Sequence, residues 1–260
     1  MAIEAVLNYL LPSDQPPTAR SAGPGAAETS VGCELDPRTI AIDDARPMAE
    51  RASLDEEGFR LIRRPTRARV DQDYTVRSGY LPEVEALVKQ ETGAARVIAF
   101  DPTRRSSAKD APPPNSAPVL RVHNDFTDAA ARQTLRQLLP HDADDLLRTR
   151  MAILQLWRPL RRVVESLPLA IADARSLAPH HFVIARRYYP GWSGEHHLVV
   201  YDAGHRWYWI PQMSPNEALL FKVYDSATDG RSRWGAHSAF VQCADAAPRE
   251  SLEVRVLAFF

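Results

Sequence analysis

A two-residue alternation runs through the last stretch of the chain, Ser251-Leu252-Glu253-Val254-Arg255-Val256-Leu257-Ala258. Side chains of a β-strand point alternately to opposite faces, so Leu252, Val254, Val256 and Ala258 share one face, while Ser251, Glu253 and Arg255 share the other. Such a strand fits a barrel whose polar inner face holds a ligand. It fits equally a sheet whose polar face is turned to solvent, and the pattern leaves both readings open.

Short β-rich runs of the same kind fill the chain from Met151 onward. They cover 151–157, 168–172, 181–189, 196–201, 206–210, 217–224, 236–242 and 251–259, and Pro or Gly residues fall in the breaks between them. Together with the run 117–122 they make about nine strands, a spacing typical of a β-sandwich or barrel.

The first half of the chain has a different texture. Residues 10–50 are rich in Pro, Gly, Ser and Ala and predict an extended arm. Amphipathic helices are expected over Pro82–Glu91, with Gly93 placed to end the first one, and over Asp128–Leu139. Helices followed by strands predict a mainly β fold, a jelly roll with N-terminal helices packed on one sheet.

The composition excludes several classes of protein. The 260 residues are 45% hydrophobic and 25% charged with a formal net charge of −1, and the basic residues are scattered, which argues against nucleic-acid binding. No apolar run is long enough to span a membrane, and the residues around Glu4 do not resemble a signal peptide. Two distant cysteines, Cys33 and Cys243, fit a reducing compartment, so we expect a cytoplasmic protein.

A candidate metal site begins at His123-Asn124-Asp125, where an apolar run gives way to a helix pattern. The side chains of His123 and Asp125 point the same way on an extended chain, so one metal ion can contact both. A third ligand from a distant strand would complete the set of two His and one carboxylate found in non-haem Fe(II) oxygenases. With 8 His and 33 acidic residues in the chain, the spacing also arises by chance, and a surface turn with a helix-capping acid is the plainer interpretation.

Two later motifs fit the same geometry. His237 opens a strand directly after a polar loop, the position that a ligand at the mouth of a barrel needs, although Glu195-x-His197 is a rival spacing. Arg249 and Ser251 then open the last strand and face the same way. A guanidinium with a neighbouring hydroxyl can hold a carboxylate. His-x-Asp, a distant His and Arg-x-Ser thus follow in an order that suits one site.

This layout resembles that of the Fe(II)/2-oxoglutarate-dependent oxygenases, and more closely the CmcJ-like (gibberellin desaturase-like) family of secondary-metabolite tailoring enzymes. The resemblance spans nearly the whole chain. It is carried by Leu7-Asn8-Tyr9-Leu10, Asp43-Asp44-Ala45-Arg46, Leu54-Asp55-Glu56-Glu57-Gly58-Phe59, Thr92-Gly93-Ala94, Leu156-Trp157-Arg158-Pro159-Leu160, Pro168-Leu169-Ala170, Leu220-Phe221-Lys222-Val223-Tyr224-Asp225-Ser226, His237-Ser238-Ala239-Phe240 and Arg249-Glu250-Ser251-Leu252-Glu253-Val254-Arg255.

The resemblance implies a single oxygenase domain over residues 1–260, with 1–50 largely an extended arm, on a distorted double-stranded β-helix (jelly roll or cupin-like). It implies that His123, Asp125 and His237 bind Fe(II), and that Arg249 with Ser251 holds 2-oxoglutarate. The expected reaction uses O2, converts 2-oxoglutarate to succinate and oxidises a small-molecule metabolite by hydroxylation, desaturation or oxidative cyclisation.

Further residues are candidates for the same pocket. Gln155 is expected either to reach the oxoacid or a metal-bound oxygen, or to be a satisfied core amide. Trp157, Arg158 and Trp234 are candidates for substrate contact, although a surface ion pair is the alternative for Arg158. The loops Asp101–Ala117 and Ser226–Gly235 precede the expected ligand strands and are predicted to form a lid. Lys222 and Asp225 are expected to make an internal ion pair.

Two other functions remain open. A jelly-roll protein that binds a small acid or a metal without catalysis is the first, but it need not keep His123, Asp125, His237 and Arg249 together. A zinc hydrolase using the same three ligands is the second, and it would leave the Arg-x-Ser pair without a role.

Overall fold

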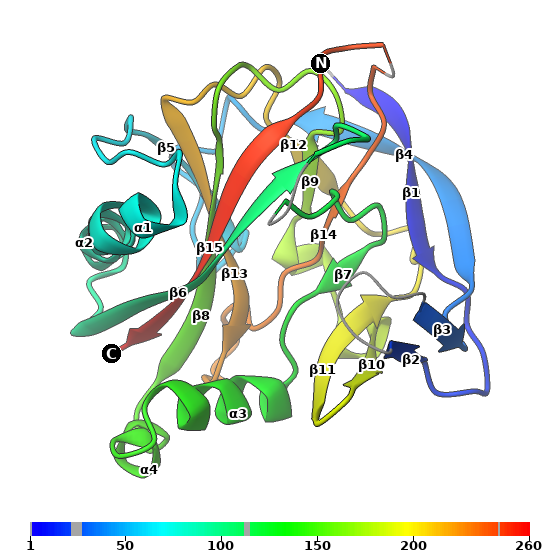
Figure 1. The fold of residues 1–260 in the computed structure, drawn as a ribbon. Helices are drawn as coiled ribbons and strands as arrows, with labels where there is room; N and C mark the ends of the chain where they lie inside the picture. Colours follow the sequence, from blue (N-terminus) through cyan, green and yellow to red (C-terminus); the bar gives the residue numbers. More distant parts are fainter. Residues whose placement is uncertain (1, 22–27, 112–114, 244) are drawn as a thin grey trace.

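The computed structural model describes residues 2–21, 28–111, 115–243 and 245–260. Two β-sheets make up most of the fold, and Figure 1 shows them side by side, with the helices at the outer side and at one end. The larger sheet has ten strands in the order β1-β4-β12-β9-β14-β7-β11-β10-β2-β3, and the smaller has five in the order β5-β13-β8-β15-β6.

The strands of the larger sheet are β1 (Ile3–Leu10), β2 (Thr18–Ser21), β3 (Glu28–Val31), β4 (Leu35–Asp44), β7 (His123–Asn124), β9 (Leu169–Ala172), β10 (Phe182–Tyr189), β11 (Trp192–Val199), β12 (Trp207–Trp209) and β14 (His237–Ala239). Those of the smaller sheet are β5 (Phe59–Arg63), β6 (Arg96–Ser106), β8 (Met151–Pro159), β13 (Glu217–Asp225) and β15 (Glu250–Phe259). The helices are α1 (Asp73–Thr75), α2 (Leu81–Thr92), α3 (Asp128–Leu138) and α4 (Ala143–Leu146), with a π-helical turn at Val76–Tyr80 and 3-10 turns at Ala174–Ser176 and Pro179–His181.

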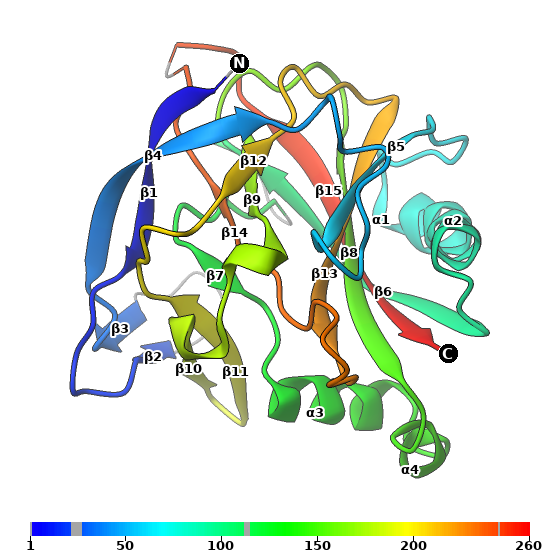
Figure 2. The ribbon, with the colours of Figure 1, turned by 180° about the vertical axis from the view of Figure 1, so that it is seen from behind.

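The smaller sheet lies between two apolar layers. On its outer face Leu154 and Leu156 of β8 join one core cluster with Val84 of α2. On its inner face Ile153 and Trp157 join a second cluster between the sheets. Because both faces are covered, all nine residues of β8 are buried. Figure 2 shows α2 on the outer side of this sheet. The predicted jelly roll with helices packed on one sheet is confirmed.

The ends of the two expected helices follow from local sequence. Pro82 lies in the first turn of α2, where its missing N–H is not needed. Gly93 closes the helix in the left-handed region, with φ of 71°, a conformation that glycine adopts without a Cβ clash. The Thr127 hydroxyl caps α3 by accepting a hydrogen bond from the Ala130 N–H at 3.0 Å.

Two parts of the fold differ from the prediction. The segment 10–50 is not simply an arm, because its described residues include β2 and β3, at one edge of the larger sheet, and β4, which lies between β1 and β12. The run 117–122 is not a strand: it makes only an isolated bridge, Asn8 with Arg121, and regular pairing starts at His123. In both places pairing with residues far along the chain decides the structure, which local periodicity does not reveal.

Candidate metal centre

Three side chains meet where the central strands of the larger sheet face the smaller sheet. His237 on β14 lies directly opposite His123 on β7 in the antiparallel register. Asp125 follows β7 and turns toward the same point. The distance from Asp125 is 3.9 Å to Nε2 of His123 and 3.8 Å to Nε2 of His237. One ligand atom from each residue lies within 4.8 Å of the other two, a spacing that can close around one metal ion.

A hydrogen bond sets the orientation of His123. Its Nδ1 donates to the carbonyl oxygen of Arg121 at 2.7 Å, which leaves the lone pair of Nε2 facing Asp125. The Nδ1 atom of His237 is buried and has no hydrogen-bond partner among the described residues. Both imidazoles therefore present Nε2 to the same space.

Burial also sets the protonation of the three groups. Burial first, and the neighbouring His237 second, lower the pKa of His123 to about 4. Burial likewise lowers the pKa of His237 to about 4, against the opposing pull of Asp125. Burial alone would raise the pKa of Asp125, but Arg255 and the two imidazoles hold it well below its usual range. At neutral pH the site thus offers two neutral imidazoles and one carboxylate, the donor set of a non-haem iron centre.

The smaller sheet holds the carboxylate of Asp125. Gln155 on β8 and Arg255 on β15 are register partners. The Gln155 amide donates to Oδ2 of Asp125, and Nη2 of Arg255 donates to Oδ1 at 3.2 Å. Gln155, expected near the oxoacid or a metal-bound oxygen or as a core amide, contacts an oxygen of a candidate metal ligand. Arg255 was not expected in the site, and its place on the polar face of the last strand is the only sequence signal for it.

Arg249 and Ser251, at the start of the last strand, are buried with unsatisfied polar atoms. Arg249 donates from Nη1 to the Leu167 carbonyl at 2.5 Å, and its guanidinium lies 5.5 Å from the ring centre of Trp157. Its Nε and the Ser251 hydroxyl have no partner among the described residues. Burial, and then Arg105, lower the pKa of Arg249. Because buried polar groups are rarely left unpaired, these atoms fit the carboxylate of a bound oxoacid.

A cavity of about 990 Å³ opens beside His123 and Asp125. These two residues and Arg255 form part of its wall. Most of its other lining residues come from β6, from the segment 116–121, from α3 and from β10 and β11. This volume lies at the upper end of the range for small-molecule sites, about 300–1,000 Å³.

The predicted substrate residues lie elsewhere. None of Trp157, Arg158 and Trp234 lines this cavity. Trp157 packs in the core under Arg249, and Trp234 packs edge-on against His197 with ring centres 5.1 Å apart. Arg158 is buried on the opposite face of β8, where it donates to the carbonyl oxygens of Arg64 and Pro215 at 2.8 and 2.9 Å. Strand alternation turns Arg158 away from this cavity, and its buried guanidinium does not form the surface ion pair given as the alternative; its substrate role stays a prediction.

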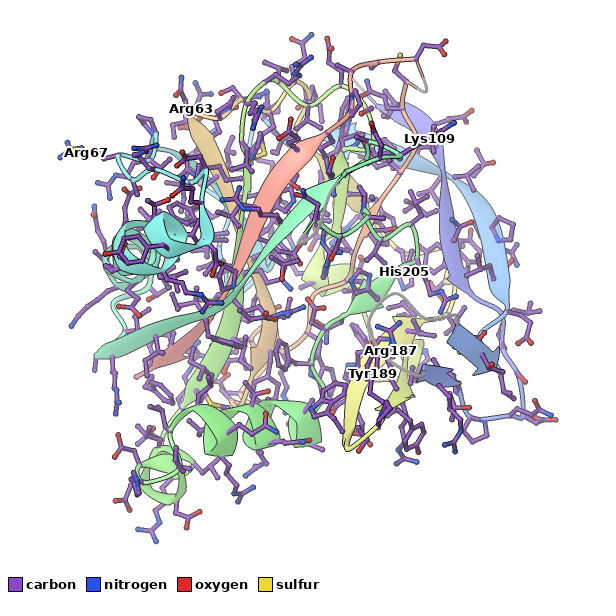
Figure 3. All side chains as sticks on the ribbon, in the orientation of Figure 1. Arg63, Arg67, Lys109, Arg187, Tyr189 and His205 are labelled. Atoms are coloured by element: carbon purple, nitrogen blue, oxygen red, sulfur yellow. The ribbon has the colours of Figure 1, made fainter. Side chains whose placement is uncertain are left out.

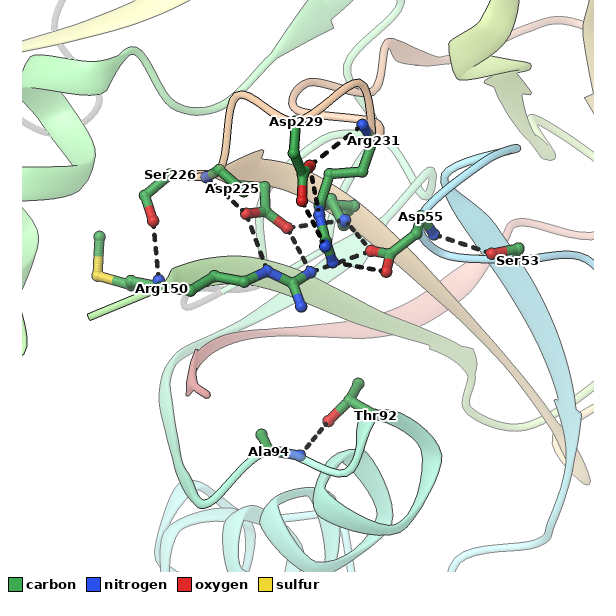
Figure 4. Close-up of polar contacts among 12 residues, drawn as sticks. Ser53, Asp55, Thr92, Ala94, Arg150, Asp225, Ser226, Asp229 and Arg231 are labelled. Atoms are coloured by element: carbon green, nitrogen blue, oxygen red, sulfur yellow. Dashed lines mark hydrogen bonds and ion pairs between the residues drawn. The ribbon is translucent and has the colours of Figure 1, made fainter.

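The loop Ser226–Gly235, which was expected to be a lid, is tied to the protein core. Figure 4 shows the charged network that holds it. Arg231 pairs with Asp55 at 2.8 Å, and Asp55 pairs with the buried Lys222 at 2.6 Å. Lys222 also pairs with Asp225 at 2.9 Å, which confirms the predicted internal ion pair. No residue of the loop lines the cavity, so the loop serves to fix the chain entering β14.

The other expected lid segment is partly a strand. Asp101 to Ser106 belongs to β6, and Asp101 and Arg105 line the cavity. Beyond it Ser116, Val119 and Leu120 also line the cavity. Residues 112–114 of the predicted lid lie outside the described residues.

Two histidines and one carboxylate between the two sheets of a jelly roll are the donor set typical of mononuclear non-haem metal enzymes. A family model described as an oxidoreductase/YMDC permease-like domain matches residues 7–259. The hydroxylase/desaturase efuI of Hormonema carpetanum is 32% identical over 89% of this chain and 86% of its own. The Fe(II)/2-oxoglutarate-dependent dioxygenase nvfI of Aspergillus novofumigatus is 32% identical over 91% of this chain and 88% of its own.

A solved structure agrees with these relatives. The iron and alpha-ketoglutarate-dependent endoperoxidase NvfI superimposes with a TM-score of 0.88 at 29% identity, covering 99% of this chain and 98% of that one. The chain therefore belongs to the family of Fe(II)/2-oxoglutarate-dependent oxygenases. It is an oxidoreductase that uses Fe(II), 2-oxoglutarate and O2 to oxidise a small-molecule metabolite. Among the described residues, none of the helices has the length and apolar character needed to cross a membrane.

Proposed function

We propose that His123, Asp125 and His237 are the residues that bind Fe(II) in this oxygenase. The observation that carries the proposal is the register of β7 and β14, which sets the two imidazoles opposite each other beside a buried, ionised Asp125. Three protein ligands leave the remaining positions on the metal for the oxoacid and O2.

Arg249 and Ser251 hold the distal carboxylate of 2-oxoglutarate in this proposal. The unsatisfied Nε of Arg249 and hydroxyl of Ser251 support it, since an arriving carboxylate would pair both. The resulting anion would also offset the burial that lowers the pKa of Arg249. Trp157 supports the guanidinium from the other side.

The chemistry then divides between cofactor and protein. Iron and the oxoacid, when bound, supply an oxidant from O2, with release of succinate and CO2. Gln155 and Arg255 keep the carboxylate of Asp125 in place during this reaction. The cavity would hold the substrate beside His123 and Asp125.

The outcome of the reaction is hydroxylation, desaturation or oxidative cyclisation of a small molecule. The relatives support this range, because efuI is named a hydroxylase/desaturase and NvfI an endoperoxidase. We propose a single oxygenase domain over residues 1–260 that acts in the cytoplasm on a secondary metabolite. The match of a family model to residues 7–259 supports the single domain, and two unpaired cysteines support the compartment.

Metal and oxoacid binding test these assignments separately. Calorimetric titration under nitrogen should show one Fe(II) per chain, and binding should be lost in His123→Ala and in His237→Ala. His141→Ala, at an exposed histidine outside the site, is the control. Full iron binding by either site variant would contradict the ligand assignment. The wild-type protein should also form succinate slowly from 2-oxoglutarate with Fe(II) and O2, whereas selective zinc binding without succinate would favour a hydrolase.

A further inference from the structure

The cavity wall carries more positive charge than the metal centre uses. Four arginines line it: Arg105, Arg121, Arg187 and Arg255. Arg255 pairs with Asp125 and Asp101. Arg105 pairs with Glu253 at 2.7 Å. These two guanidinium groups are thus already engaged by acids of the protein.

Arg121 differs from them. Its guanidinium has no hydrogen bond or ion pair to any residue in the part of the chain that the structure describes, and the residue is half-buried. Its backbone is nevertheless fixed. The carbonyl oxygen accepts the hydrogen bond from His123, and the neighbouring Val122 N–H donates to the Asn8 carbonyl at 2.8 Å. The Arg121 side chain therefore lines the cavity from a backbone that is held by hydrogen bonds.

The acids of the cavity wall do not supply a partner for it. Asp125 belongs to the metal centre, and Asp101 pairs with Arg255. Glu195 accepts hydrogen bonds from Arg186 at 3.0 Å and from the Thr127 hydroxyl at 3.1 Å. Arg187 and Tyr189, labelled in Figure 3, also extend from β10 along this wall. None of the described acids that line the cavity thus pairs with Arg121.

Covering this group has an energetic consequence. A ligand that fills the cavity removes water from Arg121, and a guanidinium left without a partner in a dry site is strongly unfavourable. An anionic group on the ligand removes that penalty through a charge-assisted, bidentate hydrogen bond. Arg121 precedes His123 by two residues, about 7 Å along an extended chain, so such an anion would lie close to the metal.

One part of the wall is apolar. The large side chains of Val119, Leu120, Leu138 and Trp192 line the cavity while between 36% and 48% exposed. The Trp192 indole lies over Gly194, where a Cβ atom would come within 2.3 Å of the ring. Tyr189 packs against the same indole with ring centres 5.4 Å apart. An exposed apolar wall of this kind is typical of a ligand site.

We propose that the substrate is an apolar organic acid whose carboxylate pairs with Arg121 while its body packs on the wall around Trp192. This inference rests on the proposed function, since it assigns a substrate class to the cavity beside the metal centre. It is separate from the oxoacid site, which uses Arg249 and Ser251.

A matched pair of fluorescent probes tests the charge. 8-Anilinonaphthalene-1-sulfonate is an aromatic anion, and N-phenyl-1-naphthylamine is its uncharged counterpart. Both are titrated into the full chain loaded with Mn(II) and 2-oxoglutarate. We expect Arg121→Gln to weaken binding of the anion about tenfold or more, as for loss of a charged hydrogen bond, and to change binding of the neutral probe less than about twofold. Gly194→Val, which displaces Trp192, should weaken binding of both probes.

The controls separate the possible failures. Arg77→Gln removes an exposed arginine that pairs with Asp73 outside the cavity, and it should change neither affinity. Absence of anion binding to the wild type, or equal affinity of Arg121→Gln and the wild type for the anion, would overturn the proposal. Displacement of the anion by 2-oxoglutarate would also overturn the proposal, because it would show that Arg121 binds the oxoacid and not the substrate. If the wild-type protein bound neither Mn(II) nor 2-oxoglutarate, that result would instead contradict the proposed function.

Discussion

Gln155 donates its amide hydrogen bond to Oδ2 of Asp125, from a strand of one sheet to the carboxylate that follows a strand of the other. This contact orients the ligand without adding charge to the site. We expect Gln155→Leu to weaken Mn(II) binding about 10- to 100-fold, the usual effect of losing a group that supports a metal ligand. Calorimetric titration measures it. Gln133→Leu changes an exposed residue that lines the cavity and should keep the wild-type affinity for Mn(II). Equal Mn(II) affinities of the wild type and both variants would show that Gln155 does not support the metal site.

Arg249 should affect the affinity for 2-oxoglutarate and not the affinity for the metal. Arg249→Gln is expected to weaken 2-oxoglutarate binding about 100-fold, because a buried charged partner of the carboxylate is lost. Ser251→Ala should cost up to about tenfold, the size of one neutral hydrogen bond. Mn(II) affinity should stay unchanged in both variants. An unaltered 2-oxoglutarate affinity in Arg249→Gln would reject the assignment.

Gly235 should be irreplaceable because of a close backbone approach. A Cβ atom there would lie 2.5 Å from the Lys222 carbonyl oxygen, and Gly235 leads directly into β14 and His237. We expect Gly235→Ala to lower the free energy of unfolding by about 1–3 kcal/mol and to weaken Mn(II) binding. At Gly79 the nearest atom to an added Cβ is 3.6 Å away, so Gly79→Ala is the matched control. A Gly235→Ala protein with normal stability and metal affinity would contradict this reading.

A buried histidine pair should make the fold sensitive to acid. His205 hydrogen-bonds to His181 at 2.9 Å and to the Tyr9 hydroxyl at 3.2 Å. Burial, and then His181, lower the pKa of His205 from 6.5 to about 4. The unfolded chain therefore binds this proton at higher pH than the folded protein does. The stability it contributes is full above pH 6.5 and falls as the pH drops toward 4.

The variant His205→Gln tests this point in metal-free protein. Its free energy of unfolding, from urea titrations between pH 7 and pH 4.5, should depend less steeply on pH, by up to about 1.4 kcal/mol per pH unit for one proton. His141→Gln, at an exposed histidine, should keep the wild-type slope. A His205→Gln slope equal to that of the wild type would show that His205 titrates alike in both states.

Features set by local periodicity were predictable from the sequence. The alternation in 251–259 and the apolar spacing around Val84 and Leu87 gave β15 and α2 with nearly correct bounds, because strand faces and helix stripes are written in neighbouring residues. The order of His-x-Asp, His and Arg-x-Ser likewise selected residues that the fold gathers on one wall. Their roles as ligands stay a prediction.

Features that depend on pairing between distant segments were not predictable. The segment 10–50 lacks strong periodicity, yet pairing within the larger sheet orders its strands. The side of the sheet on which Arg158 lies could not be predicted, because the neighbouring residues do not show which face of β8 meets α2. Arg255 was missed because its partner Asp125 lies 130 residues earlier in the chain, and only the packing of the two sheets against each other brings them together.

The most direct test of the account is a crystal grown under nitrogen with Fe(II) and 2-oxoglutarate, measured by anomalous diffraction at the iron absorption edge. We expect one iron peak bounded by His123, Asp125 and His237, with the distal carboxylate of 2-oxoglutarate bound to Arg249 and Ser251. An iron peak elsewhere, or an oxoacid carboxylate seated on Arg121, would contradict it.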